Sequence, residues 1–255
     1  MARQYALALL ASFVFASGAA RAEWDLNVKV ERFRWAEDTQ PGVTETGPRF
    51  GLGLGWTQDR ESGWLAAWRG ELYGGSVEYR GAELFPPNNA VTSTTEYTGF
   101  ITELLALYRT SGGGAALLAG LGFDYWNRQL SSIQSEEWYV TFVRLGGEIG
   151  NRTRRGGGFF AGGGVKYPIY IVEDAHVDIV FDQNPKLHPG RAPSLYAEIG
   201  YRFAENWTLT GYYDSYRFKK SPGEPVTRTS DGAPFIVFQP ESKVDTFGVR
   251  LHIHF

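Results

Sequence analysis

The chain has 255 residues, a formal net charge of -3 and no cysteine. The lack of cysteine excludes disulfides, thiolate metal sites and cysteine nucleophiles, and the lack of a strongly basic patch argues against nucleic acid as a partner. Beyond the N-terminal segment no run of about 18 apolar residues appears, so a helical membrane protein is excluded. A β-barrel remains compatible with the slightly negative mean hydropathy, because it hides its hydrophobicity in alternation.

The N-terminal segment has the organisation of a secretory signal peptide. Arg3 supplies a basic start, residues 5–16 form an apolar run, and residues 20–22 (Ala-Arg-Ala) have the small-x-small form of a cleavage site. The apolar run is too short for a membrane-spanning helix. We therefore expect residues 1–22 to be cleaved, the chain to be exported, and residues 23–255 to form one domain.

The rest of the chain contains ten segments in which apolar and polar residues alternate with the period of a β-strand. In the last segment, Phe247, Val249, Leu251, Ile253 and Phe255 alternate with polar residues or glycine. Its length matches the ~9–11 residues that a tilted strand needs to cross a bilayer. In chain order, the predicted strands are 24–37, 48–57, 64–79, 95–109, 115–126, 137–150, 158–172, 194–203, 207–218 and 246–255.

Two of these segments break the simple pattern. In the first, the phase of the alternation slips at Phe33 and Trp35, which predicts a bulge. In the seventh, Pro168 is unfavourable because it cannot donate a hydrogen bond to a neighbouring strand. The alternation in this segment predicts that Ile171 faces outward and Tyr170 inward.

The links between the segments alternate in length, as they do in outer-membrane barrels. An even number of strands also places both chain ends on the periplasmic side. The sequence therefore predicts an all-β fold, a ten-stranded antiparallel transmembrane β-barrel with short periplasmic turns and longer extracellular loops. The predicted short links are 58–63, 111–114, 151–157 and 204–206, and the long ones are 38–47, 80–94, 127–136, 173–193 and 219–241.

The last strand resembles that of a known family. The sequence from Val249 to Phe255 is similar to the C-terminal strand of the small bacterial outer-membrane β-barrel proteins, whose final Phe is recognised by the outer-membrane assembly machinery. The resemblance implies that Phe255 is an assembly signal and that the protein lies in the bacterial outer membrane. It also implies that its partners are the assembly machinery, outer-membrane lipid and lipopolysaccharide. It implies no single activity, because this fold hosts pores, adhesins, proteases and lipid-modifying enzymes.

The inward faces of the predicted strands carry seven acids and seven bases. A narrow barrel cannot leave such charges buried and unpaired, so we expect an ion-pair network across the lumen. Ten strands enclose an interior only slightly wider than the eight-stranded one that side chains fill, which favours a plugged lumen. A narrow path for ions or small solutes is the alternative, and the balanced charges argue against strong ion selectivity. The predicted network comprises Lys29, Glu31, Arg69, Glu71, Glu103, Arg109, Asp124, Arg144, Glu148, Lys166, Glu198, Arg202, Asp214 and Arg250.

Two groups of residues have the composition of a metal site. His252 and His254 alternate on the inward face of the last strand, beside Arg250. The loop 173–193 contains acids and histidines that suit a divalent cation or a cation bridge to lipopolysaccharide. Both patterns are also typical of ordinary polar residues in a lumen or a solvated loop, and we favour that interpretation, with no metal and no cofactor. The loop residues are Asp174, His176, Asp178, Asp182 and His188.

Catalysis has little support in the sequence. The ten-stranded omptin proteases use Asp and His residues at the external rim. In this chain only Asp214 and His176 are candidates for these catalytic residues. Ser215 is expected to face outward without an outward His, and a nucleophile without a base is not a site. We therefore predict no catalytic residues and no enzyme. The expected protein is a monomeric outer-membrane barrel with a structural or surface-interaction role; a low-conductance pore and an omptin-like surface hydrolase are the alternatives.

Overall fold

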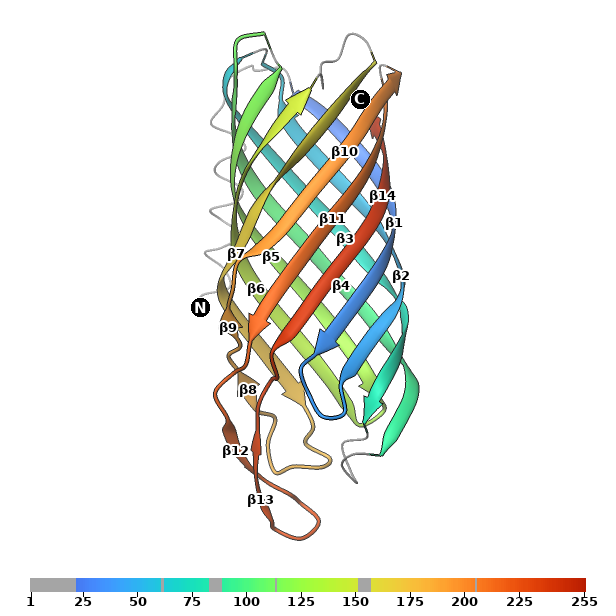
Figure 1. Cartoon of the computed structure of the whole chain (residues 1–255), viewed down its shortest axis with the longest axis vertical. Helices are drawn as coiled ribbons and strands as arrows, with labels where there is room; N and C mark the ends of the chain where they lie inside the picture. Colours follow the sequence, from blue (N-terminus) through green and yellow to red (C-terminus); the bar gives the residue numbers. More distant parts are fainter. Residues whose placement is uncertain (1–21, 61, 83–88, 113, 151–156, 205) are drawn as a thin grey trace.

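The computed structural model describes residues 22–60, 62–82, 89–112, 114–150, 157–204 and 206–255; most of the predicted signal peptide lies outside them. The long strands pair in the order β1-β2-β3-β4-β5-β6-β7-β10-β11-β14, and β14 pairs with β1, which closes the barrel (Figure 1). The predicted ten-stranded antiparallel barrel is thereby confirmed. The strands are β1 Ala22–Glu37, β2 Val43–Gln58, β3 Gly63–Ala82, β4 Ala90–Arg109, β5 Ala115–Ser131, β6 Gln134–Gly150, β7 Gly158–His176, β8 Lys186–Leu187, β9 Gly190–Arg191, β10 Ser194–Ala204, β11 Trp207–Lys219, β12 Glu224–Thr227, β13 Pro234–Val237 and β14 Ser242–His254.

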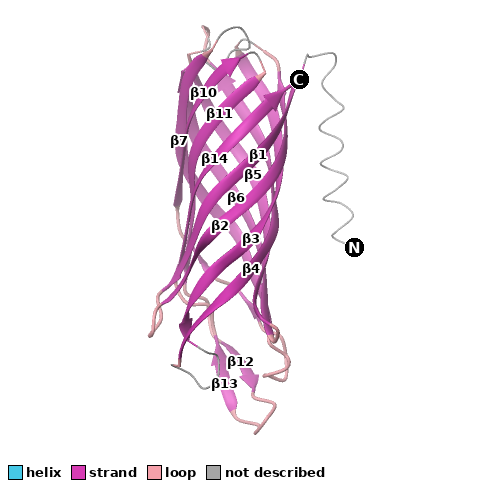
Figure 2. Ribbon diagram, turned by 90° about the vertical axis from the view of Figure 1, so that its right-hand side faces the viewer, coloured by secondary structure: helices cyan, strands magenta, loops and turns pink. Residues whose placement is uncertain are grey.

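The seam between the first and last strands defines the two ends of the barrel. The β1–β14 register runs without a shift from Asp25 opposite His254 to Glu37 opposite Ser242. The C-terminus lies at the end with the short turns, and the β12–β13 hairpin extends beyond the opposite end (Figure 1, Figure 2). We call these the periplasmic and external ends. The described residues contain no helix with the length and apolar character needed to cross a membrane.

Toward the external end, the outward residues of the strands become polar and the inward residues become apolar. On β1, Val30 faces outward and is 49% exposed, but the next outward residues are Arg32 and Arg34, whereas Phe33 and Trp35 face inward and are buried. The alternation itself continues, because β1 keeps an unbroken register with both neighbours. The predicted bulge at Phe33 and Trp35 is therefore wrong. At this level the barrel leaves the apolar band, so its outer face becomes polar and its interior becomes aromatic.

A bulge does occur in β7. The pairing of β7 with β6 jumps from Pro168 to Tyr170, which leaves Ile169 without an opposite residue. The extra residue reverses the facing of the residues after it, so Tyr170 is exposed and Ile171 is buried in the lumen at 4% exposure. The predicted orientations of these two residues are wrong because a proline, which has no N–H to donate, is accommodated at a bulge.

Several predicted external loops are in fact continued strand. For example, β5 and β6 pair up to Ser131 opposite Gln134, which leaves only residues 132–133 between them. The strands extend past the apolar band, where the inverted pattern hides them from sequence analysis. Among the described residues, two long external segments remain, residues 177–193 and 220–241.

The two long segments pack on each other, and together we call them the external cap. Phe181, Val177 and Val226 form a small buried cluster between them. A β-bridge joins Phe181 to Arg228, and the Asp182 N–H donates to the Thr227 carbonyl at 2.9 Å. The cap is therefore a folded layer with its own apolar core at the external end.

Candidate functional site

Side chains fill the lumen in four layers, and the first, at the periplasmic end, contains the two C-terminal histidines. His252 Nδ1 lies 2.8 Å from Asp25 Oδ1, and His254 Nδ1 lies 3.1 Å from Glu23 Oε1. Arg202 donates to the same Glu23 oxygen at 2.8 Å. These residues line a cavity of about 180 Å³. Among the described residues, no group of three or more His, Cys, Asp or Glu is arranged to hold a metal ion.

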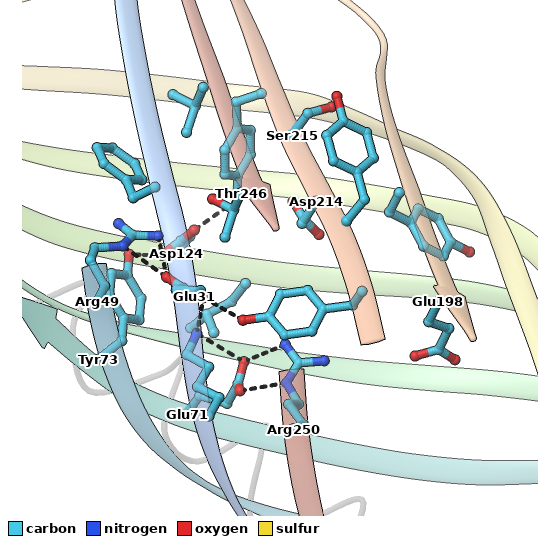
Figure 3. Close-up of a pocket in the computed structure, with 18 of the residues that line it drawn as sticks. Glu31, Arg49, Glu71, Tyr73, Asp124, Glu198, Asp214, Ser215, Thr246 and Arg250 are labelled. Carbon is cyan, nitrogen blue, oxygen red and sulfur yellow. Dashed lines mark hydrogen bonds and ion pairs between the residues drawn. The ribbon is translucent and has the colours of Figure 1, made fainter. Parts of the chain in front are cut away.

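The second layer, which we call the middle network, begins with ion pairs among β1, β2, β3 and β14. Arg250 donates from Nε and Nη2 to Glu71, each at 3.0 Å (Figure 3). Lys29 Nζ lies 3.1 Å from Glu31 and 3.6 Å from Glu71. Arg49 Nη2 approaches the other oxygen of Glu31 at 2.6 Å. Each acid is thus shared by two cations, which offsets the cost of burying its charge.

The middle network continues across the lumen on the opposite strands. Arg144 lies 2.9 Å from Glu103 and 3.0 Å from Asp214, so it connects two acids on different strands. Arg69 also pairs with Glu103, and Lys166 also pairs with Asp214. Most of the predicted network therefore comes together in this layer, namely Lys29, Glu31, Arg69, Glu71, Glu103, Arg144, Lys166, Asp214 and Arg250.

The remaining predicted network residues lie elsewhere. Asp124 accepts hydrogen bonds from the phenols of Tyr73 at 2.7 Å and Tyr216 at 2.9 Å rather than from a cation. Arg109 is the last residue of β4, at the solvated rim, and it donates to the Arg60 carbonyl at 2.7 Å. Arg109 also lines the periplasmic cavity, and its place in the predicted network stays a prediction. Of the others, Arg202 lies in the periplasmic layer, and Glu148 and Glu198 line the periplasmic cavity.

The third layer, which we call the aromatic layer, fills the lumen on the external side of the middle network. Trp35 and Trp138 are fully buried with ring centroids 5.1 Å apart, and Trp138 stacks on Trp126 at 5.4 Å. Phe218 lies 5.1 Å from Trp138. These rings come from β1, β5, β6 and β11, so they meet across the barrel. The other members are Phe33, Tyr73, Val77, Tyr97, Val140, Phe142, Ile171, Tyr216 and Val244.

The fourth layer is a buried acid cluster around one arginine. Arg128 is 1% exposed and lies 2.7 Å from Glu136, 3.0 Å from Glu45 and 3.1 Å from Glu37. Glu173 is buried beside them. One guanidinium therefore compensates several carboxylates in a site that water does not reach, and the stability of this layer depends on that single cation.

A hydrogen-bonded amide connects the acid cluster to the external cap. With its nitrogen toward Glu173, the Gln239 amide donates to both carboxylate oxygens at 3.1 and 3.3 Å and accepts from Ser242 Oγ at 2.8 Å. Gln239 belongs to the cap, so this amide connects the cap to Glu173 of the buried acid cluster.

The acid cluster was not predicted, because most of its residues lie in segments predicted as loops. Glu45, Arg128 and Glu136 lie within predicted long links, and Glu173 is the first residue of another. Arg49 was also missed, although it lies within the predicted second strand and has the inward parity of its glycines. This position in the alternation could have identified Arg49 as an inward residue.

A small cavity lies between the middle network and the aromatic layer (Figure 3). It encloses about 80 Å³ and is lined by Trp126, Tyr196 and Asp214 among others. This volume exceeds the space that a buried water needs, so the cavity has room for water.

The residues considered for catalysis do not converge. Asp214 is engaged by Arg144 and Lys166 in the lumen, whereas His176 lies at the external end of β7, 3.9 Å from Glu137. Ser215 Oγ donates to the Leu195 carbonyl at 2.8 Å and accepts from the Leu195 N–H at 3.0 Å. Its hydroxyl completes the backbone pairing at the start of β10.

The polar residues of loop 173–193 also have separate partners. Asp174 pairs with Lys186 at 2.8 Å and thereby raises the pKa of that lysine. Asp182 accepts from the Thr227 N–H at 2.9 Å, and His188 Nδ1 lies 3.4 Å from a backbone carbonyl of β7. These contacts stabilise the cap and do not form a cation site.

At the tip of the β12–β13 hairpin, Arg228 holds Asp231. Arg228 Nε donates to Asp231 at 2.8 Å. This hydrogen bond, helped by one from the Ala233 N–H, lowers the pKa of Asp231 to about 2. The acid is therefore ionised at neutral pH, and the turn keeps its ion pair.

The comparisons with known proteins concern the fold. No protein-family model and no curated protein matches the sequence. The outer membrane protease OmpT of Escherichia coli is similar in structure, with a TM-score of 0.52 and 8% identity over 91% of this chain and 95% of that chain. The translocator domain of the autotransporter NalP from Neisseria meningitidis has a TM-score of 0.42 and 10% identity over 97% and 94% of the two chains. The attachment invasion locus protein Ail of Yersinia pestis has a TM-score of 0.31 and 10% identity over 92% and 99%. The chain therefore has the fold of bacterial outer-membrane β-barrels.

Proposed function

We propose that the protein is a closed, monomeric barrel of the bacterial outer membrane that acts at its external surface and not as a channel. The observation that carries this proposal is the succession of the middle network and the aromatic layer, which fill the lumen one above the other. The fold supports the location in the outer membrane. The C-terminal strand ending at Phe255 supports insertion by the assembly machinery, among outer-membrane lipid and lipopolysaccharide.

The external cap supports a surface-interaction role. It is a folded unit tied to the barrel, and it presents apolar side chains to solvent: Ile179 is 65% exposed, Ile236 62% and Phe238 40%. Apolar side chains gathered on a protruding surface are typical of sites that contact another molecule.

The two alternatives have less support. A pore for small solutes needs a continuous path, whereas the middle network and the aromatic layer occupy the lumen one above the other. An omptin-like hydrolase needs an available acid and a histidine close together, whereas Asp214 is held by Arg144 and Lys166. We therefore assign no enzymatic role.

Single-channel recording in planar bilayers tests this proposal. We expect no unitary current steps from the purified, folded barrel, because ions would have to cross both the aromatic layer and the middle network. A wide porin inserted into the same membrane serves as the positive control. Steady, reproducible steps from the wild-type protein would contradict the closed barrel and favour the low-conductance pore.

A further inference from the structure

The outer wall of the barrel carries a cluster of basic side chains just beyond the apolar band. Arg32 and Arg34 project outward from β1, and Lys243 projects outward from the neighbouring β14. All three are exposed. The structure gives none of these three side chains an ion pair or hydrogen bond with another described residue. We call these three residues the basic patch.

The basic patch is specific to one side of the barrel. Beside it, on β11, Arg217 pairs with Asp245 at 2.6 Å, and this aspartate is the acid that lies within the patch. At the external end, the outward faces of the other strands carry Glu78 and its partner Arg80 on β3, Glu96 on β4, Glu137 on β6 and Asp174 on β7. The cation on β3 is therefore paired, whereas the three cations on β1 and β14 form a local excess of positive charge, which favours an anionic ligand there.

A groove in the lipid-facing wall lies next to the patch, on its periplasmic side. It is shallow and open, and Arg32 forms part of its lining together with Val30, Phe247 and Val249. Gly211 contributes to the groove because it leaves the outer face of β11 without a side chain next to Val249. The groove is therefore apolar along the wall and cationic at its external margin.

We propose that this groove and the basic patch bind a phosphorylated glycolipid of the outer leaflet, of the lipid A type. Its acyl chains would lie along Val30, Phe247 and Val249, and its phosphates would meet Arg32, Arg34 and Lys243. Guanidinium groups form paired hydrogen bonds with phosphate oxygens, and cations at a membrane surface attract anionic headgroups. The patch lies at the external end, which is the side of the leaflet that carries such glycolipids. This inference rests on the proposed outer-membrane location and names one lipid partner and its site.

Binding of lipid A to the detergent-folded barrel tests this site. The probe is hexa-acylated, bis-phosphorylated lipid A in mixed micelles, in buffer without divalent cations so that bridging to the acidic strands does not contribute. We expect the Arg32→Ala/Arg34→Ala/Lys243→Ala variant to lose about 100-fold in affinity, since each cation near a membrane surface contributes about 1 kcal/mol. Arg80→Ala, which removes an exposed cation on β3 that is paired with Glu78, is the matched control and should bind as the wild type does.

A second variant tests the groove separately from the charges. A side-chain carbon added at Gly211 meets its nearest neighbour, Ile199, at 3.9 Å, so Gly211→Leu fits the fold while filling the groove. It should weaken lipid A binding, whereas Ala119→Leu, on the lipid-facing side of β5, should not.

The proposal would be overturned by no binding of lipid A by the wild type, by unchanged binding by the triple variant, or by equal binding of phosphatidylglycerol and lipid A. Equal binding of dephosphorylated lipid A would also overturn it, because the cations would then have no role. Conductance does not enter this test, so its result is independent of whether the lumen is closed.

Discussion

Replacing Trp138 by alanine should lower the free energy of unfolding of the barrel by about 3–5 kcal/mol, the usual effect of truncating a large buried aromatic residue. Trp138 has no exposed surface and contacts Trp35, Trp126 and Phe218 through ring centroids 5.1–5.4 Å away. The rigid strands around it cannot collapse into the space that the indole leaves. Urea unfolding of the barrel refolded into lipid vesicles measures the change.

Ile236→Ala is the control for Trp138→Ala. Ile236 lies in the external cap and is 62% exposed, so its truncation should change the free energy of unfolding by about 0.5 kcal/mol or less. If both variants unfold at the wild-type urea concentration, the aromatic layer does not stabilise the barrel and its side chains are not tightly packed.

Replacing Arg128 by alanine should have an effect of similar size for an electrostatic reason. The substitution leaves Glu37, Glu45 and Glu136 buried without their common cation, and an uncompensated buried charge typically costs about 3–5 kcal/mol. Arg80→Ala, which breaks an exposed pair with Glu78, should cost about 1 kcal/mol or less. Equal effects of the two substitutions in urea unfolding would mean that the acid cluster does not depend on Arg128.

The pH dependence of Arg128→Ala has a definite sign. Without the guanidinium, the buried acids of the folded variant must bind protons. In the unfolded chain the same acids are surrounded by water and stay ionised. The folded state then binds more protons than the unfolded state, so the stability of the variant should fall as the pH rises. Its deficit relative to the wild type should therefore be smaller in acid than at neutral pH. Adding Glu136→Gln to the variant should recover part of the loss at neutral pH, because one charge fewer is buried.

The strand count and most inward faces could be predicted because the membrane enforces a simple rule. Where lipid surrounds the barrel, outward residues are apolar and inward ones polar, as Phe247 to Phe255 illustrate on the last strand. The inward charges at Lys29, Glu71 and Arg144 follow directly from that rule. The partners of these charges could not be predicted, since they depend on the stagger of strands that are distant in the sequence.

The external part of the barrel could not be predicted from the same rule. There, Arg32 faces outward and Phe33 inward. A rule that assigns every apolar residue to the outer face therefore predicts a bulge at this point, although the strand continues without one. The same inversion concealed the acid cluster around Arg128, whose residues fall where alternation no longer signals a transmembrane strand. The reversal after Pro168 was hidden because one inserted residue cannot be located without the partner strand.

Thiol reactivity at the centre of the aromatic layer tests the filled lumen most directly, and the absence of cysteine makes it simple to measure. Val140 faces the lumen and is fully buried, and Val140→Cys nearly preserves its volume. A small water-soluble methanethiosulfonate should leave this cysteine unmodified in the folded barrel and modify it after unfolding, whereas Asp231→Cys in the external cap should react at once in both states. Rapid modification of Val140→Cys in the folded barrel, at the rate of Asp231→Cys, would show a water-filled lumen and contradict a barrel closed by its own side chains.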